Sequence, residues 1–166
     1  MTAFFALPVL GLILVFQTAI INRVPLLQGA PDLLMLVILA WAVQERVKTY
    51  WRWSLLSGLL MSFISATPLG VYLAGYLLAT SVALLIKQWI WKIPLLAMVI
   101  ATLVGTLISH LLTLLALNVT GTVVPWLQAL NLITLPSALL NISLAVPIYA
   151  IVRDIAKWVY PEEIIV

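Results

Sequence analysis

The chain has 166 residues, of which 65% are hydrophobic and 8% charged, and its net charge is +3. Soluble domains carry about 25% charged residues, so this composition excludes an ordinary soluble fold and indicates an integral membrane protein. Cysteine is absent, which excludes a disulfide framework, and the scattered basic residues form no stripe that would bind nucleic acid.

The N-terminal stretch predicts a retained first span. It is apolar up to residue 21 and has neither a basic start nor a small-residue cleavage site. A loop follows, and Pro31 and Asp32 then open the second span, because proline suits a first helical turn and a carboxylate there meets the positive end of the helix dipole. The second span, 33–43, is short for a bilayer crossing, so we expect it to tilt little, thin the bilayer or extend its ends.

The stretch from Ser54 to Ile86 contains no charged residue. A single helix of this length would exceed a hydrocarbon core of about 30 Å. Pro68 and Gly70 lie in its middle, where they break helices. The stretch therefore predicts two spans, 53–67 and 69–86, joined by a tight turn at Thr67–Gly70.

The sequence as a whole predicts one all-α membrane domain, residues 1–166, with six transmembrane helices. The expected spans are about 3–21, 33–43, 53–67, 69–86, 93–117 and 131–152. With six spans, seven of the eight basic residues share one side: Arg46, Lys48, Arg52, Lys87, Lys92, Arg153 and Lys157. The eighth, Arg23, lies opposite. The positive-inside rule then places both termini in the cytoplasm.

Small and polar side chains recur at helical spacing within the spans. Because lipid gives helices no hydrophobic reason to associate, such stripes mark close packing between helices. The candidates are Ser54, Gly58 and Ser62 in the third span, Gly75 and Ala79 in the fourth, Thr106 and Ser109 in the fifth, and Asn141 in the sixth. They either pack within the molecule or form an interface with a partner or a second copy in a homodimer. Both alternatives stay open at this point.

The ionisable residues give little support to a catalytic or metal-binding function. His110 is the single histidine and lies inside a span, where a hydrogen bond to a neighbouring helix and a functional contact are the two interpretations. No cysteine or second histidine would complete a metal site. We expect no catalytic residue, no cofactor and no metal, and Asp32 is expected to cap a helix.

Two motifs resemble the MreD family of rod shape-determining membrane proteins. The first is Pro31-Asp32-Leu33-Leu34. The second joins Gly58, Ser62 and Ser65 to the turn Pro68-Leu69-Gly70. The resemblance covers roughly residues 28–90. In the family a carboxylate often stands four residues after the first glycine, whereas this chain has Ser62 there.

The resemblance implies a non-catalytic scaffold or regulatory subunit of bacterial cell-wall elongation. Such a subunit would bind MreC, a single-span protein with a large external domain, and act with RodA, penicillin-binding protein 2 and MreB in peptidoglycan synthesis. It also implies a fold similar to the substrate-binding components of energy-coupling-factor (ECF) transporters. The alternative function is such a transporter subunit, with His110, Asn131 and Asn141 converging on an outward pocket.

Overall fold

The computed structural model describes residues 2–19, 26–45 and 47–161, with side chains from residue 7 onward. Over these ranges the chain is helical, and its β-structure is limited to an isolated bridge between Leu26 and Gly29. The predicted positions of Arg23 and Arg46, and the end of the first predicted span, lie outside the described residues. The elements are α1 (Thr2–Ala19), α2 (Leu33–Val43), α3 (Tyr50–Ile64), α4 (Val71–Trp89), α5 (Pro94–Val119), α6 (Trp126–Ala129), the π-helical segment η2 (Leu130–Thr134) and α7 (Leu135–Val159).

Among the described residues, three stretches of helix are long and apolar enough to cross a membrane. They are α4, α5 and the run Trp126–Val159, in which α6, η2 and α7 follow one another. Leu7–Ala19 and α2 are apolar but shorter, and α3 has 15 residues. The described residues are therefore all-helical with three long apolar helices, and the six predicted crossings require three shorter helices as well.

The shortest of these apolar helices, α2, lies at the centre of the molecule. It packs against α1, α3, α4, α5 and α7, and each of its residues except Val37 is buried. Eleven residues rise only about 16 Å, roughly half of the hydrocarbon core. We expected a helix this short to tilt little, thin the bilayer or extend its ends. The structure gives another solution, because the surrounding helices separate α2 from lipid.

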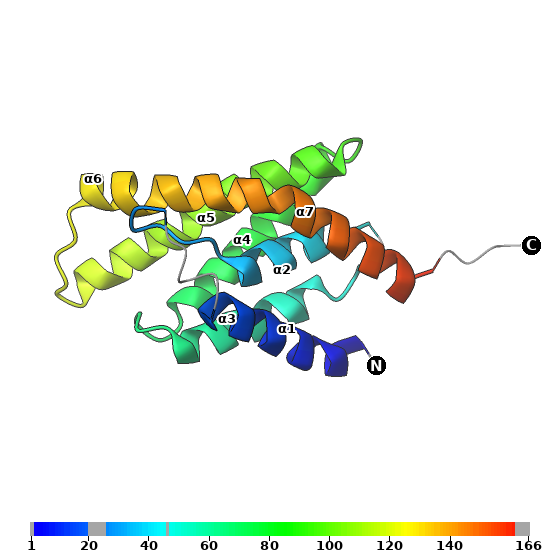
Figure 1. The fold of residues 1–166 in the computed structure, drawn as a ribbon, viewed down its shortest axis with the longest axis horizontal. Coiled ribbons are helices and arrows are strands. Elements are labelled where there is room, and N and C mark those ends of the chain that lie inside the picture. Colours follow the sequence, from blue (N-terminus) through cyan, green and yellow to red (C-terminus); the bar gives the residue numbers. More distant parts are fainter. Residues whose placement is uncertain (1, 20–25, 46, 162–166) are drawn as a thin grey trace, which may run out of the picture.

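The connections between helices alternate between the two ends of the bundle. The start of α1, the α2–α3 and α4–α5 connections and the end of α7 lie at one end, and the α3–α4 and α5–α6 connections lie at the other (Figure 1). The predicted fold-back at Thr67–Gly70 is present: Gly70 has a φ of 94°, and the Val71 N–H donates to the Pro68 carbonyl at 3.2 Å. A left-handed backbone of this kind favours glycine.

Candidate functional site

Five side chains from different parts of the chain meet at the N-terminal end of α2. We call them the Asp32 cluster: Gln17, Asp32, Tyr76, Thr106 and Asn141. Asp32 is the N-cap residue of α2, and its carboxylate accepts a hydrogen bond from the Met35 N–H at 3.0 Å. The fully buried Tyr76 donates its hydroxyl hydrogen bond to the same carboxylate, with distances of 2.7 and 2.8 Å to the two oxygens. The predicted cap is thus also a link between α2 and α4.

The cluster extends from α2 to α1, α5 and α7. The Asn141 side chain accepts a hydrogen bond from the Asp32 N–H at 2.8 Å and donates one to Thr106 Oγ1 at 3.0 Å. Gln17 Oε1 accepts from the Leu34 N–H at 3.1 Å. These bonds satisfy backbone N–H groups at the start of α2 that have no partner within the helix. An irregular segment beside a membrane helix is tolerated when protein groups satisfy it in this way.

Hydrogen-bond donors surround the Asp32 carboxylate. It accepts from the Met35 N–H of the helix that it caps and from the Tyr76 hydroxyl of α4. The carboxyl is held by donors on both sides, as expected of a structural cap.

The loop before Asp32 is held against η2 and the start of α7. The Gln28 N–H donates to the Leu132 carbonyl at 3.1 Å, and the Ala30 N–H donates to Ser137 Oγ at 3.1 Å. A Cβ on Gly29 would lie 2.7 Å from the Ile133 carbonyl oxygen, so glycine permits the close approach. η2 widens the helix where the loop docks, and π-helical turns of this kind are rare and often occur at functional sites.

The other end of α2 is closed by a charged side chain. Lys87 of α4 donates hydrogen bonds from Nζ to the Gln44 carbonyl at 2.6 Å and to the Ala42 carbonyl at 3.2 Å. A cation at the C-terminal end of a helix also interacts favourably with the helix dipole. Polar groups from neighbouring helices therefore satisfy both ends of α2.

Replacing Lys87 with methionine is expected to lower the free energy of unfolding by about 2 kcal/mol, because two carbonyl groups lose a charged donor. The measurement is thermal unfolding in detergent. Lys92→Met is the matched control. Lys92 is exposed, and its Nζ atom lies over the Trp91 ring, 5.3 Å from the ring centroid. Equal loss of stability in the two variants would contradict this role of Lys87.

The small residues of the predicted stripes lie between helices of the same molecule. A Cβ on Gly58 would lie 2.7 Å from Leu73 Cα, and one on Gly75 would lie 3.3 Å from Ser109 Oγ. Ala79, Thr106, Ser109 and Asn141 are all buried. The stripes therefore serve the packing of α3, α4, α5 and α7, which leaves little of them for a partner.

A lateral groove lies between α1 and α7, with α2 as its floor. We call it the α1/α7 groove; its volume is about 290 Å³. Apolar and tryptophan side chains line it throughout: Val9, Ile13, Val37, Trp41, Trp53, Ile148, Ile151, Val152 and Ile155. The rings of Trp41 and Trp53 lie 4.9 Å apart, and neither buried indole N–H has a hydrogen-bond partner among the described residues. Val37, the one α2 residue that is not fully buried, lines this groove.

A comparison with known families agrees with this architecture. The family model described as rod shape-determining protein MreD matches residues 1–159. The chain belongs to the MreD family. No curated protein and no solved structure matches it, so the expected likeness to substrate-binding components of ECF transporters has no support. Proteins of the MreD family determine rod shape and are generally non-catalytic. Family membership and the three long apolar helices together indicate that this chain is a membrane protein with a role in rod shape.

The residues of the MreD motifs lie in two places. Pro31 is buried beside Asp32 at the start of α2. Gly58 and Ser62 lie on the buried face of α3. The remaining residues form the α3–α4 connection, namely Ser65, Pro68, Leu69 and Gly70. Ser65 Oγ and Thr67 Oγ1 lie 3.1 Å apart there, and Leu69 is 81% exposed. The two motifs therefore have different structural roles. The first holds the start of α2, and the second packs α3 and forms the turn between α3 and α4.

The residues suggested for a transporter pocket do not converge. The His110 Nδ1 atom lies 3.1 Å from Thr134 Oγ1, which joins α5 to η2. Asn141 is buried in the Asp32 cluster, whereas Asn131 is exposed. His110 instead borders a shallow apolar hollow between α5 and α6, with Leu107, Leu111 and Trp126. This arrangement gives no observation in favour of a transporter subunit.

Sequence reasoning missed several residues of these sites. Gln17, Tyr76 and Lys87 all hold α2, and Trp41 and Trp53 line the α1/α7 groove. A signal existed for Gln17 and Tyr76, because a polar group inside an apolar span needs a partner. Tryptophans near the ends of spans are typical of the membrane interface, and no local pattern distinguishes such a residue from one that lines a groove, as Trp41 and Trp53 do.

Proposed function

We propose that this MreD-family chain is a non-catalytic scaffold of the bacterial cell-wall elongation machinery that holds the single span of MreC in the α1/α7 groove. The supporting observation is the groove itself, since it is apolar throughout and opens between two helices beside the rigid α2. Within lipid, helices associate by close packing, and a preformed groove provides surface for such packing. RodA, penicillin-binding protein 2 and MreB would then join through MreC or through the chain itself.

The proposed topology has six crossings of the inner membrane with both termini in the cytoplasm. The distribution of basic residues supports it, because the helix ends and connections that lie at one end of the bundle (Figure 1) carry the described residues Lys48, Arg52, Lys87, Lys92, Arg153 and Lys157. Counting α1, α2 and α3 as crossings requires that α2 be shielded by protein. Its burial and the polar groups at its two ends make this compatible with a short helix.

The proposal can be tested by a substitution that fills the α1/α7 groove with a larger side chain. Ile151→Trp places a large side chain on the groove wall and should reduce the MreC recovered with the chain from mild detergent by about tenfold, because overpacking an interface costs about 1–3 kcal/mol. Leu139→Trp is the matched control: both residues lie on α7, and they are 60% and 61% exposed, but Leu139 is outside the groove.

The same two variants should differ in cells. A strain that depends on the Ile151→Trp chain should lose its rod shape, whereas the Leu139→Trp strain should keep it. Equal MreC recovery from both variants, or rod-shaped cells with a filled groove, would contradict the proposal.

A further inference from the structure

Two adjoining hollows lie on the basic side of the bundle, where α2, α4 and α7 end and α5 begins. The larger has a volume of about 370 Å³ and lies between the end of α2, the end of α4 and the start of α5. The smaller, of about 240 Å³, lies between the end of α2 and the last turns of α7. Val43, Glu45 and Pro94 line both, so the two hollows form one site around Glu45, which we call the Glu45 site.

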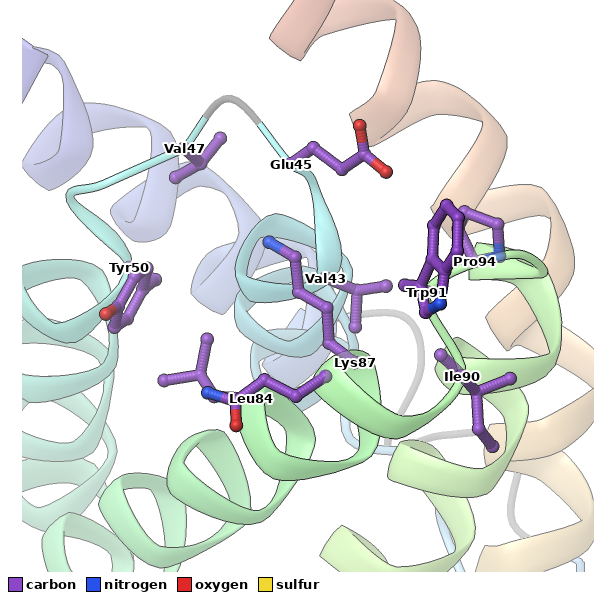
Figure 2. Close-up of a pocket in the computed structure, with 11 residues that line it drawn as sticks. Val43, Glu45, Val47, Tyr50, Leu84, Lys87, Ile90, Trp91 and Pro94 are labelled. Carbon is purple, nitrogen blue, oxygen red and sulfur yellow. The ribbon is translucent and has the colours of Figure 1, made fainter.

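Charges of opposite sign face each other across the Glu45 site without pairing. Figure 2 shows the Glu45 side chain extending toward α7, while Lys87 points to a different side of the larger hollow. Arg153 and Lys157 of α7 line the smaller hollow with Glu45. Their i, i+4 spacing places them on one face of the helix. Glu45 makes no hydrogen bond or ion pair with another described residue.

The two basic groups of α7 are available to a ligand. Arg153 contacts Asp154 at 3.0 Å, but both side chains are exposed, with fractions of 44% and 65%. An ion pair this exposed contributes about 0–1 kcal/mol, so a phosphate could replace it. Arginine and lysine together are well suited to a phosphate group, the first by its planar fork of donors and the second as a point charge.

The surroundings place the Glu45 site at the level of lipid headgroups. Trp91 lines the larger hollow, and Tyr149 lines the smaller. Trp91 and the nearby Trp158 are 62% and 85% exposed. Tryptophan and tyrosine gather where a membrane meets water. The apolar side chains of Leu84 on α4 and Ala97 on α5 also line the larger hollow, and both lie inside their helices, on the side where an acyl chain would lie.

We propose that the Glu45 site binds a phospholipid whose headgroup carries both a phosphate and a primary ammonium, as in phosphatidylethanolamine. Arg153 and Lys157 would hold the phosphate, and the Glu45 carboxylate would accept hydrogen bonds from the ammonium. An anionic headgroup without an amine would leave Glu45 unpaired beside the phosphate and meet its repulsion. A trimethylated amine would present no N–H to Glu45. The inference is independent of the proposed MreC interaction, because the α1/α7 groove shares no lining residue with the Glu45 site.

The test compares lipids with identical acyl chains. The purified full chain in detergent is titrated with phosphatidylethanolamine, phosphatidylcholine and phosphatidylglycerol, and bound lipid is counted by native mass spectrometry. Phosphatidylethanolamine should bind about tenfold more tightly than the other two, since it alone supplies a charge-assisted hydrogen bond to Glu45. Equal binding of all three, or strongest binding of phosphatidylglycerol, would overturn the proposal.

Variants separate the two halves of the site. Glu45→Gln should remove the preference for phosphatidylethanolamine. The double variant Arg153→Gln, Lys157→Gln should lower the affinity for all three lipids. Lys92→Gln is the control, because Lys92 lies outside both hollows, and it should leave the preference unchanged. An unchanged preference in Glu45→Gln would overturn the proposal.

A competition experiment distinguishes binding of a membrane lipid from binding of its soluble headgroup. Free phosphoethanolamine should displace bound lipid only at far higher concentration, because it lacks the acyl chains. Displacement at equal concentration would overturn a lipid as the occupant. Absence of any lipid binding, with capture of a basic peptide instead, would do the same.

Discussion

Replacing Asp32 with alanine is expected to lower the free energy of unfolding by about 3 kcal/mol. The loss of an N-cap costs about 1 kcal/mol, and the loss of a hydrogen bond to a charged acceptor costs about 1.5–3 kcal/mol. Tyr76 would also keep a buried hydroxyl without its acceptor. The measurement is thermal unfolding in detergent, with Asp154→Ala as the control, because Asp154 is an exposed carboxylate in a surface pair.

A double-mutant cycle isolates the contact that joins α2 to α4. Tyr76→Phe removes the hydroxyl alone, and the double variant with Asp32→Ala should be less destabilised than the sum of the two single variants by about 1–2 kcal/mol. Additive losses would mean that Asp32 acts only as a helix cap. In that case the link between α2 and α4 would carry no energy.

Replacing Gly58 with alanine is the second substitution with a large expected effect. It should lower the free energy of unfolding by about 2 kcal/mol. The new Cβ would lie 2.7 Å from Leu73 Cα, a backbone atom that cannot rotate away, so α3 and α4 must separate and lose packing. Alanine is otherwise the better helix former by about 0.5–1 kcal/mol, which makes a loss of stability informative. The midpoint of thermal unfolding in detergent measures it.

Two other glycines serve as controls for Gly58. A Cβ on Gly75 would lie 3.3 Å from the Ser109 hydroxyl oxygen and at ordinary contact distances from Ser109 Cα (3.6 Å) and Cβ (3.7 Å), and a Cβ on Gly11 would meet nothing within 4 Å. Gly75→Ala should be close to neutral, and Gly11→Ala should stabilise the chain by about 0.5 kcal/mol through helix propensity. If the three substitutions had the same effect, close packing between α3 and α4 would not explain the presence of Gly58.

The positions of the helices could be predicted from local patterns, whereas the role of α2 could not. Runs of apolar residues end at prolines, glycines and charges, which is why α2 occupies Leu33–Val43 and the chain turns at Gly70. Hydropathy alone does not say whether a short apolar helix faces lipid or protein. That distinction depends on α4, α5 and α7 enclosing it.

The Asp32 cluster shows the same limit at the level of single contacts. Asp32 could be predicted as a cap, because a cap depends on its own helix. Its partners Tyr76 and Asn141 lie 44 and 109 residues further along the chain, and no spacing rule joins them. The π-helical turn of η2, where the loop before Asp32 docks, has no sequence pattern either. Contacts of this kind arise only once the helices have packed.

We infer that protein, rather than lipid, surrounds the short helix α2 inside the membrane. Photolabelling with a phospholipid that carries a diazirine in its acyl chain tests it on the unmodified protein, with adducts located by mass spectrometry of peptides. Adducts should form at lipid-facing residues of α5 and α7 such as Leu107 and Val146, which are 41% and 46% exposed, and residues 33–43 should remain almost free of them. Adducts on residues 33–43 as frequent as those on α5 would contradict the account.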